Sequence, residues 1–262
     1  MLNVGSGYRA FAPFGIIVAL SLGLVIGYWL ATRPGPLSAR TLNFLQQNPQ
    51  WLLQHPSILE QSRRLEARRF DEHQRDRRRG LVQAAQQRWF SDWPQTGAEA
   101  GKLTLLEFTD YACVACRVSQ PSLEYLVSSN PDARFAIVFL PASGTASEFA
   151  ARAAIVVWKN APHQFLQFHQ SLMRAPVDSD AATITAIANS VGVSKDTLMR
   201  EAGSTDVVNA LAAMRQLAAD LKVVGLPSFI IDGTLITGHG KAVQHAIDEA
   251  RQQSQMKANR AP

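Results

Sequence analysis

Cysteine is scarce in this chain, whose 262 residues include only Cys113 and Cys116. A scaffold held by several disulfides is therefore excluded, and a disulfide within one chain has to join this pair. An excess of basic over acidic residues is also missing from most of the sequence. Residues 33–80, with ten Arg, no Lys and five acidic residues, carry a local charge of +5, which equals the net charge of the whole chain. A main domain that binds nucleic acid is not expected, because its basic face would have to lie outside that stretch.

Internal repeats are lacking, and the arginine cluster is the only biased tract. Apolar residues make up 47% of the chain and charged residues 18%. This composition provides enough apolar surface for a packed core, so wholesale disorder is excluded. The length suits one large domain, or one domain with a helical extension.

One long apolar run lies near the N-terminus. Residues 10–31 form a stretch of 22 residues without a charge, which is long enough to span a bilayer as a helix. Tyr28 and Trp29 stand at its far end, where interfacial aromatic residues belong. The alternative is a cleaved signal peptide, whose apolar region is about 7–15 residues long and ends in small residues. Because the run is too long for that, we expect an uncleaved transmembrane anchor after a short cytoplasmic tail at residues 1–9.

A helical arm is expected at residues 32–87. Prolines divide it into three helical segments, of which the last runs from about Ser57 to Arg79 and stops near Gly80. Its arginines alternate with acids, which is typical of a solvated, salt-bridged helix. A second interpretation is a homo-oligomer formed through residues 38–80, and a third is that the arginines bind anionic lipid headgroups or nucleic acid. The second rests on six apolar residues, too many to leave in water: Leu42, Phe44, Leu45, Trp51, Leu52 and Leu53.

Residues 88–255 predict an α/β domain. Apolar runs rich in β-branched and aromatic residues predict buried strands at 103–109 and 134–140, with a helix from Arg117 to Ser129 between them. The later features are a helical insertion at about 142–222, a hairpin turn at Asp232-Gly233, a last helix at about 241–252 and a disordered tail at 256–262.

Cys113 and Cys116 stand at the start of the helix that follows the first strand. Unpaired N–H groups and the positive end of the helix dipole favour the thiolate of Cys113 over its thiol. A thiolate both attacks a disulfide and leaves one readily. Cys116 lies one turn deeper on the same face of the helix. The pair therefore suits a two-step exchange, in which one sulfur forms a mixed disulfide with a substrate and the other resolves it.

A Cys-x-x-Cys pair is also half of a structural zinc site, which needs two more ligands. No third cysteine exists, and His163 and His169 begin 47 residues downstream in a predicted helix. We therefore expect neither a metal nor another cofactor. Two unreactive buried cysteines are the remaining alternative, but the strand-to-helix context favours the redox interpretation.

Two further positions bear on this chemistry. Glu107 lies within the first apolar strand. In one interpretation, the Glu107 carboxylate faces water at a sheet edge. In the other, the carboxyl group is buried beneath the cysteines, where desolvation raises its pKa and allows it to move the proton of Cys116. Pro227 follows Leu226 and precedes a strand, so its peptide bond is either trans in an ordinary turn or cis. In the cis case, the Leu226 backbone would pair with an extended substrate beside the sulfurs.

Together these segments resemble a known family. The stretches LLEFTDYACVAC, ARFAIVFLP and GLPSFIIDG, with the helical insertion, are similar to DsbA-family thiol:disulfide oxidoreductases, which have a thioredoxin fold. LNFLQQNPQWLLQHPSILEQS, SEFAARAA and FHQSLM resemble the Com1/ScsC-like branch, so that the resemblance covers about residues 40–252. It implies that Cys113 is the exposed nucleophile, Cys116 the resolving thiol, Pro227 a cis proline and Glu107 a buried acid. It further implies that the insertion covers the active face and that the arm mediates oligomerisation.

Two positions depart from the family pattern. Val114 and Ala115 stand between the cysteines, where strongly oxidising members carry a histidine that helps hold the thiolate. We therefore expect a less oxidising pair. Leu226 stands before the proline in place of Thr or Val, which affects substrate preference and not the type of reaction.

The apolar run and the resemblance together predict a membrane-anchored thiol:disulfide oxidoreductase, with residues 10–31 in a bacterial inner membrane and the catalytic domain in the periplasm. Flanking charges do not fix this orientation, but dithiol oxidation needs an oxidising compartment. The expected partners are protein thiols or disulfides and a membrane redox partner that resets the pair. One alternative is a disulfide isomerase or reductase working as an oligomer. A rival from another class is a non-catalytic tethered adaptor or chaperone.

Overall fold

A computed structural model describes residues 39–89, 91–98, 101 and 103–259. These residues divide into two compact units between Ala67 and Arg68. The predicted membrane span at residues 10–31 and the tail at residues 1–9 lie outside the described residues. Within the described ranges, no helix is both long enough and apolar enough to cross a bilayer.

The first unit is helical. It contains α2 (Ala39–Gln47), α3 (Pro49–Gln54) and the first part of α4 (Pro56–Trp89). Proline is favoured at a first helical position because its fixed φ suits the helix and its missing N–H has no partner there. The Trp51 ring stacks on His55 with ring centroids 4.1 Å apart and meets Phe44 edge-on at 6.0 Å. Phe44 and Leu53 nevertheless remain 47% and 77% exposed.

Helix α4 does not stop at Gly80, as the sequence predicted, but continues to Trp89. Beyond the glycine, Leu81, Val82 and Trp89 pack against the core, and Ala85 is fully buried. This burial outweighs the roughly 1 kcal/mol that a glycine costs within a helix. The prediction was wrong because a local stop signal was overridden by tertiary packing.

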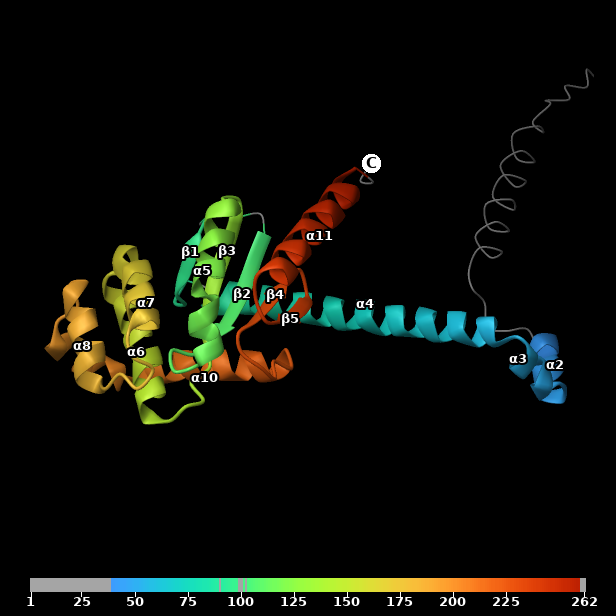
Figure 1. Cartoon of the computed structure of the whole chain (residues 1–262), viewed down its shortest axis with the longest axis horizontal. Coiled ribbons are helices and arrows are strands. Elements are labelled where there is room, and N and C mark those ends of the chain that lie inside the picture. The colour runs from blue at the N-terminus through green and yellow to red at the C-terminus, as the bar shows by residue number, and fades with distance from the viewer. Residues whose placement is uncertain (1–38, 90, 99–100, 102, 260–262) are drawn as a thin grey trace, which may run out of the picture. The chain divides into compact units, whose positions relative to one another are not determined.

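The second unit is built on a five-stranded sheet with the order β1-β3-β2-β4-β5 (Figure 1). The strands are β1 (Gln95–Gly97), β2 (Leu103–Thr109), β3 (Ala133–Phe139), β4 (Ser228–Ile231) and β5 (Thr234–Thr237). β2 and β3 are parallel and are joined by α5 (Val114–Ser129), while the other pairs are antiparallel. The predicted strand, helix, strand unit is thus observed. The short edge strand β1 was not predicted.

The helical insertion between β3 and β4 is observed where the sequence predicts it. It comprises α6 (Thr145–Asn160), the 3-10 turn Pro162–Gln164, α7 (Phe165–Arg174), α8 (Ala181–Ser190), α9 (Lys195–Ala202) and α10 (Thr205–Asp220). The last helix, α11 (Lys241–Ala258), extends past the predicted end near Gln252, and residues 260–262 of the predicted tail lie outside the described residues.

The sheet buries both faces, because successive side chains on a strand point to opposite sides. On one face, Leu105 and Phe135 pack with α5 and α11 in a cluster that includes Leu123 and Ile247. The other face packs against residues of α4, α6 and α10; its strand residues are Leu106, Phe108, Ala136, Val138 and Ile230. The cysteine-bearing helix therefore covers the first face.

The hairpin between β4 and β5 turns at Asp232 and Gly233, both with positive φ, as the sequence predicts. Helix α4 packs closely on this turn: a side chain at Gly233 would come within 2.3 Å of the Arg75 carbonyl oxygen. Arg79 donates to both carboxylate oxygens of Asp232, at 2.7 and 2.8 Å, and Arg78 donates to the Gly233 carbonyl at 3.1 Å. The interpretation of α4 as a purely solvated helix is therefore wrong for this part.

Candidate active site

The two cysteines lie at the N-terminal end of α5. Cys113 is the N-cap residue, with an extended backbone and a half-buried side chain. Its sulfur accepts the backbone N–H of Cys116 at 3.2 Å. Cys116 is fully buried one turn further on. The helix start predicted from the sequence is thus observed, with one sulfur at the surface and the other beneath it.

Burial raises the pKa of the Cys116 thiol to about 12, and its hydrogen bond with Cys113 adds to this effect. At neutral pH Cys116 is therefore a thiol and not a nucleophile. It needs a base before it can attack. Cys113 is less buried, and its sulfur lies at the start of the helix, where it accepts the Cys116 N–H.

The loop before Cys113 is anchored by Asp110, a residue that the sequence analysis did not single out. This buried carboxylate accepts the N–H groups of Ala112 and Ala142, each at 3.0 Å, and the hydroxyl of Ser147. Its carbonyl accepts the N–H of Cys113 at 3.1 Å. Asp110 therefore ties the cysteine loop to the start of α6. Only the fold brings these segments together, so the sequence offered no signal.

Arg117 makes a second unpredicted link. Its guanidinium donates to the carbonyl oxygens of Tyr111, Met173, Ala175 and Pro176. The last three acceptors lie at the C-terminal end of α7, where a positive charge is favourable. One side chain thus joins the cysteine loop to the helical insertion.

Tyr111 and His169 form a buried pair on the same side of the sheet. The Tyr111 hydroxyl and His169 Nδ1 are 2.9 Å apart, and the Tyr111 ring stacks on Phe139 at 5.2 Å. Burial lowers the pKa of His169 to about 4, so its ring is neutral at physiological pH. The sequence analysis considered His169 only as a zinc ligand. Within the described residues, no group of three metal-binding side chains comes together.

Glu107 is 1% exposed in the centre of the sheet. Since β2 lies between β3 and β4, the alternative of an edge strand with a solvated carboxylate is wrong. Desolvation raises the pKa of Glu107 to about 8. Neither carboxylate oxygen has a hydrogen-bond partner among the described protein groups. The nearness of this carboxylate also adds to the effect of burial in raising the pKa of Tyr111.

The Leu226-Pro227 bond is cis, the second of the two predicted alternatives. Pro227 directly precedes Ser228, which is in register with Phe108, so it reaches the end of β2 where the cysteine loop begins. The Pro227 carbonyl accepts the N–H of Gly238 at 2.9 Å. Leu226 makes no backbone hydrogen bond to any described residue.

Several apolar side chains near the cysteines remain in water. Val114 and Val118, one turn apart on α5, are 62% and 66% exposed. Val224, two residues before Leu226, is 92% exposed. Scattered apolar residues are ordinary on surfaces, but Val114 and Val118 follow Cys113 on the same helix, and Val224 belongs to the segment that leads to the cis proline. They offer contact area to an unfolded or apolar segment.

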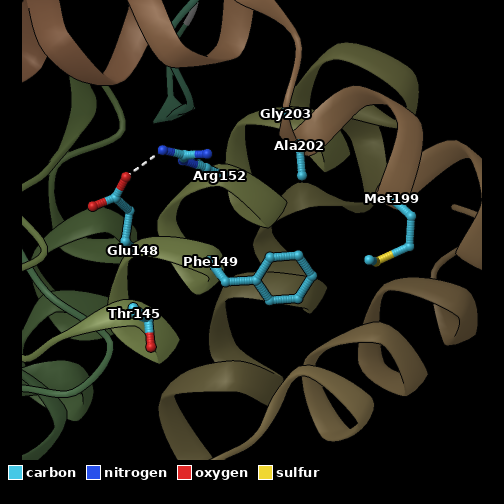
Figure 2. Close-up of a pocket in the computed structure, with 7 residues that line it drawn as sticks. All are labelled: Thr145, Glu148, Phe149, Arg152, Met199, Ala202 and Gly203. Carbon is cyan, nitrogen blue, oxygen red and sulfur yellow. Dashed lines mark hydrogen bonds and ion pairs between the residues drawn. The ribbon is translucent and has the colours of Figure 1, made fainter.

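A separate hollow of about 380 Å³ lies in the insertion (Figure 2). Phe149 and Met199 point toward it from α6 and α9. Glu148 at its rim is paired with Arg152 and Arg215. None of the residues predicted for the active site lines this hollow. It provides no chemistry for the cysteine pair.

The cysteines at the start of α5 and the cis proline both lie in the part of the chain that the comparisons with known proteins match. Residues 104–252 match the model of the DSBA-like thioredoxin domain. The chain therefore belongs to the DSBA-like thioredoxin domain family, and the resemblance predicted from the sequence is confirmed.

Among curated proteins, disulfide bond formation protein D of Bacillus subtilis (strain 168) is 30% identical over 96 residues. The match covers 35% of this chain and 43% of that relative, so less than half of the relative is represented. An ScsC variant from Proteus mirabilis is 25% identical with a TM-score of 0.60, over 84% of this chain and 100% of that one. A periplasmic thioredoxin-like protein from Salmonella enterica serovar Typhimurium is 31% identical with a TM-score of 0.53, over 64% and 94% of the two chains.

Proposed function

We propose that this protein is a membrane-anchored periplasmic oxidoreductase that exchanges disulfides with protein substrates through Cys113 and Cys116. The observation that carries the proposal is the unequal placement of the two sulfurs. One caps α5 and accepts the N–H of the other residue, while the second is fully buried below it. Such a pair separates capture of a substrate from its release.

In the first step, the Cys113 thiolate attacks a substrate disulfide. A bond forms between the two sulfurs, the substrate disulfide breaks, and the leaving sulfur takes the electron pair as a thiolate. The helix start and the Cys116 N–H favour the negative charge on Cys113 before the attack. When the pair begins as a disulfide, a substrate thiolate attacks Cys113 and the same bonds are exchanged in reverse.

In the second step, Cys116 attacks the Cys113 sulfur and releases the substrate thiolate. Its thiol first loses a proton, which Glu107 accepts. Because burial raises the pKa of Glu107 to about 8, only part of this group is ionised near neutral pH, and that ionised fraction acts as the base. Glu107 is buried on the face of the sheet that α5 covers, and Cys116 is buried within α5 itself.

Substrate contact falls to the loop of Leu226 and Pro227 and to the exposed valines. The backbone of Leu226 offers an N–H and a carbonyl to an extended segment, which would pair with it as an added strand. Val114, Val118 and Val224 supply apolar area around it. This combination favours unfolded protein substrates over small thiols.

Residues 10–31 supply the membrane anchor in this proposal, and a membrane redox partner resets the pair. The periplasmic assignment is supported by the chemistry, since disulfides persist in oxidising compartments. It is also supported by the similarity to a periplasmic thioredoxin-like protein.

A second candidate function is a disulfide isomerase or reductase that works as a homo-oligomer through residues 38–80. The exposed side chains of Phe44, Leu53, Leu65 and Phe70 favour it, because each is 47–77% exposed on the helical arm. A non-catalytic adaptor would use the same surfaces but would not need the sulfurs. Sedimentation of the full chain in detergent, compared with a variant carrying Leu53→Ser and Phe70→Ser, tests the assembly.

Insulin reduction by the full chain in detergent tests the exchange function. We expect activity in the wild type and in Ser129→Ala, an exposed control at the far end of the same helix, and none in Cys113→Ser. Cys116→Ala should accumulate mixed disulfides through Cys113. A Cys113→Ser variant with full biological activity would instead support the adaptor.

Redox titration of the pair tests the expectation from Ala115. Because no histidine stands between the cysteines, the potential should be less oxidising than that of the strongest family members. An equally oxidising potential would refute this expectation and leave the exchange reaction itself intact.

A further inference from the structure

The loop between α10 and β4 is held by few hydrogen bonds. Its backbone is fixed at Val223, whose N–H donates to a carbonyl of α10 at 2.9 Å, and again at Ser228, where β4 begins. Between these two residues, the backbone makes only two hydrogen bonds to described groups. The Gly225 carbonyl accepts the Ser228 hydroxyl, and the Pro227 carbonyl accepts the N–H of Gly238. The conformation of this loop therefore depends on a small number of contacts.

The Ser228 hydroxyl is the side-chain group that holds the loop. It is fully buried, donates to the Gly225 carbonyl at 2.6 Å and lies 3.0 Å from the Thr237 hydroxyl oxygen on β5. Because a hydroxyl has one proton to donate, the Thr237 hydroxyl is the donor in the second contact. Thr237 thus orients the Ser228 hydroxyl, and Ser228 fixes the Gly225 carbonyl.

The end of β5 also holds the loop by packing. A side chain at Gly225 would meet the Thr237 Cγ2 methyl at 3.1 Å, so the loop lies directly against this strand. Gly238, the residue after Thr237, binds the Pro227 carbonyl at 2.9 Å. The two fixed carbonyls stand on either side of Leu226, whose own backbone groups bind no described residue. The contacts therefore hold the loop and leave the Leu226 backbone open to a substrate.

This hydroxyl pair lies at the same end of the sheet as the cysteine loop. Ser228 is in register with Phe108, and β2 ends one residue later at Thr109. The segment that carries Cys113 begins there. A polypeptide captured on Cys113 therefore lies at the end of the sheet where the Ser228 hydroxyl fixes the loop.

We propose that the hydroxyl pair of Ser228 and Thr237 positions the Leu226 backbone for extended polypeptide substrates, so that Ser228 is a positioning residue for substrate binding. The inference rests on the proposed exchange function and adds to it the side chains that fix the substrate loop. A loop already held in its binding conformation does not have to be ordered when the substrate binds. Neither hydroxyl takes part in the transfer between sulfurs.

The test compares two disulfides that release the same coloured thiolate, nitrothiobenzoate. One is a short extended peptide whose single cysteine is joined to nitrothiobenzoate, and the other is dithiobis(nitrobenzoate), which has no peptide backbone. In both reactions the Cys113 thiolate forms a disulfide with one sulfur of the reagent, and nitrothiobenzoate leaves with the electron pair. Stopped-flow absorbance with the reduced full chain in detergent gives the half-saturating peptide concentration and the limiting rate.

Ser228→Ala removes both hydroxyl contacts and should raise the half-saturating peptide concentration about tenfold, with little change in the limiting rate. The ratio of the peptide rate constant to that of dithiobis(nitrobenzoate) should fall by the same factor. Thr237→Val removes only the donor and should have an effect of about threefold, whereas Thr237→Ser keeps the hydroxyl and should restore the wild-type value. Because Thr237 is exposed, its variants keep the test decisive where Ser228→Ala does not fold.

Thr234→Val is the matched control. Thr234 begins the same strand and is in register with Ile231, at the end of β4 away from the loop, so this variant should match the wild type with both reagents. A peptide N-methylated on both sides of its cysteine is the second control, because it lacks the N–H groups that an added strand donates. With this peptide, the difference between the wild type and Ser228→Ala should shrink.

Equal half-saturating concentrations in the wild type, Ser228→Ala and Thr237→Val would overturn the inference. Slowing by the same factor with both reagents would also overturn it, because the hydroxyl pair would then only stabilise the fold. A wild type that releases no nitrothiobenzoate from either reagent is a different result, since it would remove the exchange function on which the inference rests.

Discussion

The two faces of the central sheet differ in what they bury. One face has an apolar centre, with Leu106, Phe108 and Val138 packed on α4, α6 and α10, although the buried hydroxyl of Ser228 lies in register with Phe108. The face beneath α5 mixes Leu105 and Phe135 with the carboxylate of Glu107. Both faces are fully buried, so exposure does not separate them. The difference lies in the acid of Glu107, because its desolvation in the face beneath α5 raises its pKa and costs stability when it is ionised.

That cost has a physical origin. A carboxylate without a partner loses its hydration on burial and gains no hydrogen bond in return. Such groups persist where the surrounding structure is stable enough to hold them, which is common at functional sites. The apolar face supplies that stability here.

The largest expected effect comes from removing the buried acid. The folded state raises the pKa of Glu107 from 4.5 to about 8, so the folded protein binds this proton more tightly than the unfolded chain. Its favourable contribution is complete below about pH 4.5 and is lost as the pH rises through about 8. Glu107→Gln should therefore match the wild type near pH 4.5 and exceed it at pH 9, by on the order of 5 kcal/mol.

Urea unfolding at pH 5, 7 and 9 measures this difference. A gap between wild type and variant that stays constant with pH would mean that the carboxylate is not desolvated. The two faces would then not differ as described.

The apolar face should respond without any dependence on pH. Phe108→Ala leaves a cavity in a fully buried site and should lower the free energy of unfolding by about 3–5 kcal/mol at every pH tested. Val118→Ala, on the exposed side of α5, should change it by less than about 0.5 kcal/mol. A pH-dependent loss in Phe108→Ala would place a titrating group on this face.

The smallest effect is expected at the sheet edge, where α4 meets the hairpin. Arg79 binds both carboxylate oxygens of Asp232, and both side chains are less than a third exposed. Arg79→Ala should cost about 1–2 kcal/mol in urea unfolding. Exposed Arg69→Ala on the same helix should cost less than about 0.5 kcal/mol. If both substitutions lowered the free energy of unfolding equally, the contact between Arg79 and Asp232 would contribute nothing, and α4 would behave as a solvated helix along its whole length.

Short-range sequence patterns predicted the features of this fold that depend on neighbouring residues. The strand, helix, strand unit around the cysteines, the hairpin at Asp232 and the insertion were all readable from periodicity and turn residues. The stop at Gly80 was predicted wrongly, because burial of Ala85 was not visible in the sequence. The strand at residues 95–97 is too short to give a pattern of its own.

The site divides in the same way. Cys113 and Cys116 were placed by spacing, and Pro227 by its turn and by resemblance to a family. Asp110 and Arg117 were missed because each forms hydrogen bonds with backbone groups of other elements. Every residue has such backbone groups, so the sequence does not show which of them will be the partners. The pair Tyr111 and His169 is separated by 58 positions and meets only through the packing of α7 on α5.

Alkylation of the reduced protein at pH 7 gives the most direct measure of the unequal sulfurs. Iodoacetamide followed by peptide mass spectrometry should modify Cys113 while Cys116 stays unmodified, and both should react once urea unfolds the chain. Modification of both residues at similar rates in the folded protein would contradict the division into a capturing and a resolving sulfur.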